Sequence, residues 1–335
     1  MKKSLIALAV LAVSGMASAQ STVTIYGLLD TYVGAVKSKG GVPGTLTQTV
    51  VNSGGIQTSR FGFKGSEDLG GGLKANFVLE AGFNIDTGAI PNNGPTNSSL
   101  FSRNSWVGLS GGFGEVKIGK MWTAYDDLVG SGISAFNANV FAPSAKVFSS
   151  ANNYNDRPGN SISYATPDFG GFTGAASYSF GENKTAAVSA GRVAAFNVAY
   201  AGGPVFVGLA HQTEKANGAA ATAKFTQLNG SYDLGVAKLL AAYGNVKNVG
   251  GVPKTTEYQI GADFPLGGAF TISGGFARSK DEVAGANVTR KGFGIAGLYA
   301  LSKRTNAYVG FNDTKSTDVT VGKDRILAAG VRHTF

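Results

Sequence analysis

The sequence predicts an all-β fold, a 16-stranded antiparallel transmembrane β-barrel. Short segments alternate apolar and polar residues, as expected of strands with one face toward lipid and the other toward water. The connections between them are alternately short and long, a rhythm typical of a barrel with tight turns at one rim and loops at the other. Glycine contributes 50 residues, which disfavours helices. These three observations agree on one architecture.

Residues 1–19 are expected to be a secretory signal peptide, whose cleavage leaves one domain over residues 20–335. A basic pair at positions 2–3 precedes an apolar run at 5–13, and Ala-Ser-Ala ends the segment. The apolar run is too short to cross a membrane as a helix. Cleavage removes two lysines and lowers the formal net charge from +9 to +7. We therefore expect an exported protein.

The composition also excludes several classes of protein. No cysteine is present, so a disulfide framework, thiolate catalysis and a cysteine-based metal site are all excluded. Lysines and arginines occur singly along the predicted strands rather than in clusters, which argues against nucleic-acid binding. No cofactor is expected.

The strands follow in order from residue 22. Thr22–Val33 is the first, and a Gly- and Thr-rich connection over 38–55 leads to Arg60–Lys64, where Phe61 and Phe63 oppose the basic residues. Seven short turns are expected near 66–72, 110–114, 167–172, 201–204, 233–236, 264–269 and 301–304. Eight longer connections are expected near 38–55, 85–100, 122–157, 182–191, 213–222, 246–254, 279–290 and 313–323. Fifteen connections define sixteen strands. A soluble sandwich or propeller also predicts short strands, but needs a second set of apolar faces.

The connection at 122–157 is the longest and differs from the others in composition. It is rich in aromatic and apolar residues, among them Trp122, Tyr125 and Phe136, so it has side chains that can pack. Long loops without regular structure are usually functional or disordered, and this composition argues against disorder. We expect this third long loop to fold into the barrel and to set the size limit of the passage.

The chain ends on an alternating strand, Asp324–Phe335, with Leu327 and Val331 on the same face as the final phenylalanine. A terminal aromatic residue on such a strand resembles the assembly signal of outer-membrane barrels. Phe335 is therefore expected to act as that signal.

Over its whole mature length the chain resembles a general bacterial porin of the β-proteobacterial type. The resemblance is carried by the segments at 23–30 (VTIYGLLD), 59–74 (SRFGFKGSEDLGGGLK), 103–109 (RNSWVGL), 113–119 (FGEVKIG), Tyr125-Asp126 and 330–335 (GVRHTF). It implies a homotrimer of sixteen-stranded barrels in the outer membrane, each narrowed by its third long loop. It also implies passive diffusion of small hydrophilic solutes and no chemical reaction.

The resemblance further implies an arginine cluster on the wall that faces the loop, at Arg60, Arg103 and Arg157. An arginine on the lipid face near the bilayer midplane costs roughly 2–4 kcal/mol, which independently favours the lumen. The alternation of faces along a strand also places Arg60 and Arg157 toward the lumen. By the same alternation, Arg103 falls on the same face as the apolar residues Val107 and Leu109. Further lumen charges are expected at Lys64, Lys74, Glu80 and Lys117.

The carboxylates of the long loop are few. Asp126 and Asp127 lie near its start, and the next acid is Asp156, so Gly132 and Phe136 occupy a stretch where related porins place acids. In a narrow passage, charge of one sign raises the local concentration of its counter-ion. We therefore expect anion selectivity, with Tyr125, Asp126 and Asp127 on the loop side. The alternative is that the arginines form wall salt bridges with Glu80 or Asp126.

Other functions are weaker interpretations of the same residues. Catalysis would require a histidine near its partners, and the two histidines, His211 and His333, are isolated in the sequence. The Gly292-x-Gly294-x-x-Gly297 match lies within an alternating strand and lacks the strand-to-helix context of a dinucleotide site. Two adjacent carboxylates do not make a divalent-cation site, and no metal is expected. The remaining rivals are a substrate-specific channel for sugars or organic acids and a non-conducting surface or adhesion barrel. Lipopolysaccharide is an expected neighbour in the outer membrane.

Overall fold

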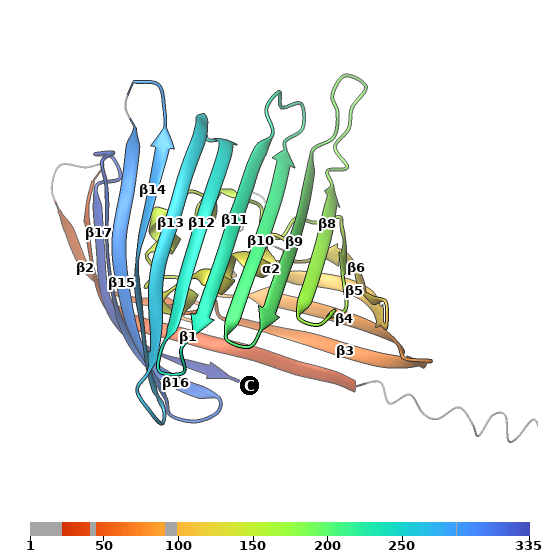
Figure 1. The fold of residues 1–335 in the computed structure, drawn as a ribbon, viewed down its shortest axis with the longest axis horizontal. Helices are drawn as coiled ribbons and strands as arrows, with labels where there is room; N and C mark the ends of the chain where they lie inside the picture. The colour runs from red at the N-terminus through yellow and green to blue at the C-terminus, as the bar shows by residue number, and fades with distance from the viewer. Residues whose placement is uncertain (1–21, 41–44, 91–98, 286) are drawn as a thin grey trace, which may run out of the picture.

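The computed structural model describes residues 22–40, 45–90, 99–285 and 287–335. The expected signal peptide at 1–19 lies outside these residues. The strands are β1 (Thr22–Lys39), β2 (Leu46–Ser53), β3 (Arg60–Gly70), β4 (Leu73–Gly82), β5 (Asn104–Gly111), β6 (Gly114–Lys120), β7 (Ser161–Ala165), β8 (Phe172–Phe180), β9 (Arg192–Gly202), β10 (Val205–Lys215), β11 (Ala223–Asp233), β12 (Lys238–Val249), β13 (Val252–Pro265), β14 (Phe270–Glu282), β15 (Val288–Ala300), β16 (Thr305–Ser316) and β17 (Lys323–Thr334). All are antiparallel neighbours in one sheet (Figure 1).

The sheet closes into a 16-stranded barrel, as the sequence predicts. The last strand β17 pairs with β1 from Leu28↔Thr334 to Lys39↔Lys323. The seventeen labelled strands fill sixteen places because β2 and β3 share one. β2 pairs with the upper half of β1 and β3 with its lower half, and residues 54–59 interrupt them.

Two connections differ from the sequence prediction. The expected connection over 38–55 is mostly strand, because β2 occupies 46–53. The expected long connection at 246–254 is a two-residue turn between β12 and β13. Gly250 and Gly251 both have positive φ, at 57° and 77°. Such a pair fits the tight hairpin turns that require φ > 0 at both central positions, so the flanking strands extend further than the sequence pattern indicates.

The two faces of the wall alternate as expected. On β15, Phe293, Ile295 and Tyr299 are about half exposed on the outside, whereas Ala296 is buried on the inside. The glycines of the Gly292-x-Gly294-x-x-Gly297 match lie within this strand, so the dinucleotide interpretation does not apply. On β17, Leu327 and Val331 face outward.

The two ends of the chain meet at the lower rim. The backbones of Phe335 and Gly27 exchange hydrogen bonds there, each of 3.1 Å. This contact places the terminal phenylalanine where the barrel closes, and its role as an assembly signal remains a prediction.

The segment between β6 and β7 lies inside the barrel, behind β9–β14 in Figure 1. It contains α2 (Asp126–Val129), η1 (Gly130–Gly132), η2 (Ala135–Asn137), α3 (Ser144–Val147) and α4 (Ser150–Asn153). Buried loop residues such as Ile133, Phe141 and Val147 form a core with inward wall residues such as Ala277 and Ala296. No helix in the described part of the chain is long and apolar enough to cross a membrane.

Candidate functional site: the passage beside the third loop

The third loop is held against one side of the barrel by polar side chains that point inward from the wall. Asn197, Gln227 and Asn229 donate from β9 and β11 to the carbonyls of Ala124, Val129 and Leu128, at 2.6, 2.8 and 2.8 Å. Gln259 on β13 donates to the carbonyl of Gly132 and accepts from Ser134. Further contacts come from Glu257, Ser273, Ser279 and Asn312. Each such bond contributes about 1 kcal/mol, so together they fix the path of the loop.

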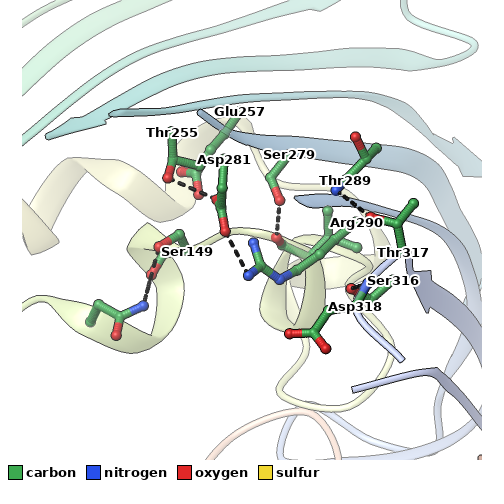
Figure 2. A network of polar contacts seen from close by, with 12 residues as sticks. Ser149, Thr255, Glu257, Ser279, Asp281, Thr289, Arg290, Ser316, Thr317 and Asp318 are labelled. Atoms are coloured by element: carbon green, nitrogen blue, oxygen red, sulfur yellow. Dashed lines mark hydrogen bonds and ion pairs between the residues drawn. The ribbon is translucent and has the colours of Figure 1, made fainter. Parts of the chain in front are cut away.

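Figure 2 shows polar side chains of β13, β14 and β15 at and beside this anchor, among them Glu257, Ser279 and Asp281. The buried Glu257 accepts from the backbone N–H and the hydroxyl of Ser150, at 3.0 and 2.5 Å. Beside it, Asp281 accepts from Thr255 and forms a 2.8 Å ion pair with Arg290. These inward carboxylates are therefore engaged in structure rather than left free in the passage.

The loop also reaches the opposite wall, at the interruption between β2 and β3. The backbone N–H groups of Asn139 and Val140 donate to the carbonyls of Ile56 and Gly55, at 3.1 and 3.2 Å. The interruption is itself shaped by the buried carboxylate of Asp30, which accepts from the N–H groups of Gly55, Ile56 and Gln57 and from the hydroxyl of Tyr308. The loop thus crosses the lumen and is attached on both sides.

A cavity of about 770 Å³ remains beside the loop. Four basic side chains line it, Arg60, Arg103, Lys146 and Arg157, and three acidic ones, Glu80, Asp126 and Asp156. The three arginines that sequence and resemblance indicate are therefore brought together, from β3, the residue before β5 and the exit of the loop. Lys146, on α3, was missed because nothing in the local sequence shows which side of the loop faces the cavity.

Arg103 lies inside, which resolves the conflict in strand alternation. β5 begins at Asn104, so Arg103 precedes the regular strand and its side chain is not bound by the alternation of Val107 and Leu109. Its Nε lies 2.7 Å from Glu80 Oε1. Arg60 reaches the other oxygen of Glu80 at 3.5 Å, and Tyr26 donates its hydroxyl to the same carboxylate. The alternative of wall salt bridges is therefore correct in part, but one carboxylate serves two guanidiniums.

Arg157 is held differently, by an aromatic ring. Its Cζ lies 3.3 Å from the ring centroid of Trp122, and Arg103 lies 5.6 Å from the same ring. A 2.8 Å ion pair joins it to Asp156. Burial lowers the pKa of Arg157, yet an arginine remains charged at neutral pH. The sequence shows Trp122 only as a loop aromatic, because the contact depends on the loop returning to its own start.

Asp126 is the acid of the loop whose charge is most sensitive to its surroundings. Burial raises its pKa to about 7, while the hydrogen bond from Tyr154 lowers it. Burial also keeps the pKa of Tyr154 well above its usual value, so the phenol stays protonated and donates to Asp126. Near neutral pH Asp126 is therefore only partly ionised. Asp127 is exposed and does not belong to the described cavity lining.

The remaining predicted site residues play other parts. Tyr125 is 1% exposed and packs edge-on against Tyr154, with ring centroids 5.0 Å apart, so it anchors the start of the loop. Lys117 lies over Trp106 and pairs with Glu115, and Lys64 lies over Tyr26. Lys74 is exposed next to the lower turn of β4. These three lysines lie outside the described lining of the cavity.

The groups needed for other chemistry are dispersed. His211 contacts Thr226, and His333 contacts Thr305, both on the outward face. Glu214 instead binds the N–H of Asn155 inside the barrel. Among the described residues, no cluster of three or more potential metal-ligating side chains occurs.

A closed barrel with an apolar outer face and a charged passage within defines a membrane channel. The family model described as Gram-negative porin matches residues 4–319, and the chain belongs to that family. Its location is the outer membrane, and its relatives are channels rather than enzymes. It is 37% identical to outer membrane porin protein 32 of Delftia acidovorans, covering 99% of this chain and 95% of the relative. It is 31% identical to an outer membrane porin protein of Bordetella pertussis (strain Tohama I), over the full length of both.

Solved structures agree with this assignment. The anion-selective porin from Comamonas acidovorans superposes with a TM-score of 0.78 and 28% identity, over 94% of this chain and 100% of that one. OmpT of Vibrio cholerae in its trimer form superposes with a TM-score of 0.70 over 94% and 99% of the chains. At 17% identity, that second likeness shows the fold alone.

Proposed function

We propose that this porin passes small hydrophilic solutes with a preference for anions, through a constriction between its third loop and Arg60, Arg103 and Arg157. The observation that carries the proposal is the imbalance of charge around the cavity. Four basic side chains meet three acidic ones, and one of these acids, Asp126 on the loop, has its pKa raised to about 7. In a passage with low-dielectric walls such an excess enriches anions. The similarity to the anion-selective porin from Comamonas acidovorans supports the same preference for anions.

Reversal potentials across a planar bilayer with a potassium chloride gradient test the selectivity. We expect chloride to be preferred, and Arg157→Gln to reduce that preference. Lys64→Gln is the matched control, because it removes one positive charge from the lumen face outside the cavity lining. A preference for potassium in the unaltered protein would refute the proposal.

The geometry argues against the two rival channel types. A substrate-specific channel would present a ladder of aromatic rings along the lumen. The aromatic residues in the described lining of the cavity, Trp122, Tyr125, Phe148 and Tyr154, instead all belong to the third loop, and Tyr125 and Phe148 are only 1% and 3% exposed. A non-conducting barrel would be plugged, yet a cavity of about 770 Å³ remains. Conductance that rises linearly with salt concentration supports the general pore. Conductance that saturates would favour the specific channel, and the absence of conductance would favour the plugged barrel.

We further propose that the protein assembles as a homotrimer through the face around β5–β7. These strands contain 8, 7 and 5 residues, whereas β12–β15 contain 12–14. A membrane-spanning strand needs about 9–11 residues, so the short face is poorly matched to lipid and suits contact with protein.

The absence of cysteine makes this assembly easy to test. Val107→Cys on β5 and Ile260→Cys on β13 place single thiols on outward positions that are 60% and 62% exposed. A short thiol cross-linker should join subunits only through position 107. Equal cross-linking at both positions, or a monomeric mass in detergent, would contradict the proposed interface.

A further inference from the structure

Five basic side chains form a row across five neighbouring strands at the rim that carries the loops. Lys39 on β1 lies opposite Lys323 on β17, which lies opposite Lys315 on β16. Lys315 lies opposite Lys291 on β15, which lies opposite Arg278 on β14. With neighbouring strands about 4.8 Å apart, the row is about 19 Å wide. In the sequence these residues are isolated, and only the register of the sheet brings them together.

The row faces outward. Lys291 shares its face of β15 with Phe293 and Ile295, which are about half exposed. Lys323 shares its face of β17 with Leu327. Arg278 lies between Ala277 and Ser279, which are both 0% exposed on the inside. The row is therefore separate from the passage and from its arginines.

Such a row is unfavourable by itself. Like charges directly opposite each other on one face of a sheet destabilise the pairing. Within the described residues, only Lys323 of the five forms an ion pair, to Asp313 at 3.1 Å, and that acid is shared with Arg325 at 2.6 Å. Four of the five positive charges are left without a carboxylate, which leaves the row short of negative charge.

The height of the basic row on the barrel wall indicates which part of the membrane can supply the missing negative charge. Phe293 lies two residues below Lys291, and Tyr258 lies opposite Arg278. Phe311 packs against Phe293 with ring centroids 5.7 Å apart, and Arg325 lies 5.7 Å from the centroid of Phe311. Aromatic girdles mark the membrane–water interface of such barrels. The basic row therefore lies just beyond the apolar band, at the level of lipid headgroups.

We propose that this row is a binding site for the phosphate groups of lipopolysaccharide in the outer leaflet. The long connections mark the extracellular rim of an outer-membrane barrel. Several phosphates on one headgroup can face several cations spread over about 19 Å of wall, whereas a single free anion meets only adjacent ones. Binding there would relieve the repulsion within the row and fix one lipid against β14–β17 and β1.

The test is a titration of the full-length folded protein in detergent with diphosphorylated lipid A. Lys291→Gln with Lys315→Gln removes two adjacent charges of the row, neither of which forms an ion pair among the described residues. We expect roughly 25-fold weaker binding, about fivefold for each lysine. The control is Lys303→Gln with Arg304→Gln, which removes the same charge from the exposed turn at the opposite rim. This control should bind as tightly as the unaltered protein.

Three further arms make the outcome decisive. Lys291→Arg with Lys315→Arg keeps the charge and should keep the affinity, which separates charge loss from a folding defect. Dephosphorylated lipid A should bind no more tightly to the unaltered protein than to the glutamine variant. Inorganic pyrophosphate should not displace lipid A at equal concentration. Equal binding of both lipids, equal loss in both glutamine variants, or displacement by pyrophosphate would overturn the proposal.

Discussion

The guanidinium of Arg157 stacks over the indole of Trp122, with Cζ 3.3 Å from the ring centroid. The two residues stand at the exit and the start of the third loop, and the backbone N–H of Thr123 closes the same juncture by donating to the carbonyl of Asp156 at 2.9 Å. A cation over a tryptophan face gains about 0.5–2 kcal/mol. The ring therefore both closes the base of the loop and orients a positive charge at the cavity.

Trp122→Ala should lower the anion preference by about twofold or more, because Arg157 loses contact energy of about 0.5–2 kcal/mol and its orientation. Reversal potential and single-channel conductance measure the effect. Trp106→Ala is the matched control. It removes the only other tryptophan, which contacts Lys117 at 5.4 Å outside the cavity lining. If both variants change selectivity equally, the stacking on Trp122 has no special role.

Selectivity should depend on pH through Asp126. Its pKa is raised to about 7, so the carboxyl is neutral at lower pH and negative at higher pH. The negative charge opposes the arginines. The anion preference should therefore fall as the pH rises from about 5.5 to about 8.5, a range that brackets this pKa, and Asp126→Asn should remove most of this dependence.

Two variants check that assignment. Tyr154→Phe removes a hydrogen bond that lowers the pKa of Asp126, so the midpoint should move to higher pH. Asp127→Asn removes a neighbouring negative charge that raises the pKa of Asp126, so the midpoint should move the opposite way, to lower pH. A pH dependence that survives in Asp126→Asn would assign the titration to another group.

The strand pattern could be predicted from the sequence because alternation is a local property. Phe61 and Phe63 against Arg60, or Leu327 and Val331 on the last strand, need only their neighbours. The details of the site could not be predicted from the sequence, because they depend on contacts between residues that are far apart in the chain. Gln259 holds Ser134 from 125 positions away. No local signal shows that Lys146 faces the cavity or that five separate basic residues align along one rim.

Gly132 and Phe136, which occupy the stretch of the loop where related porins place acids, illustrate the same limit. Their side-chain positions do not point into the cavity in this structure. Gly132 faces the wall, where a Cβ atom would meet the carbonyl oxygen of Ala241 and the side chain of Asn229. Phe136 packs against the buried core of the loop. An acid at either position would disturb the loop rather than add charge to the passage.

Asn137→Asp is the better test, because Asn137 lines the cavity and the substitution keeps its size. A fourth carboxylate would equal the four basic side chains in number, so the anion preference should fall by about twofold or more. Asn153→Asp, on the same loop but outside the described lining, should have little effect. Unchanged reversal potentials in Asn137→Asp would mean that this side of the loop does not line the ion path.

Gly310→Ala should displace the third loop. The ring of Phe141 packs against this glycine of β16, where an added Cβ atom would lie 2.6 Å from two ring carbons. Real Cβ contacts of that length do not occur, so the ring or the strand must move. Overpacking of this kind costs about 1–3 kcal/mol. The loop should lose order, with altered single-channel conductance and faster proteolysis at 138–148.

Gly230→Ala provides the control for that experiment. Gly230 lies on β11, and the nearest atom to an added Cβ is the carbonyl oxygen of Phe206 at 3.7 Å, an ordinary contact. Its φ is not positive, so alanine adopts the same backbone. Conductance and proteolysis should match the unaltered protein. If Gly310→Ala also behaved like the unaltered protein, the packing of Phe141 against Gly310 would not be needed to hold the loop. The polar contacts from Gln259, Glu257 and Asn312 would then be sufficient to keep the loop inside the barrel.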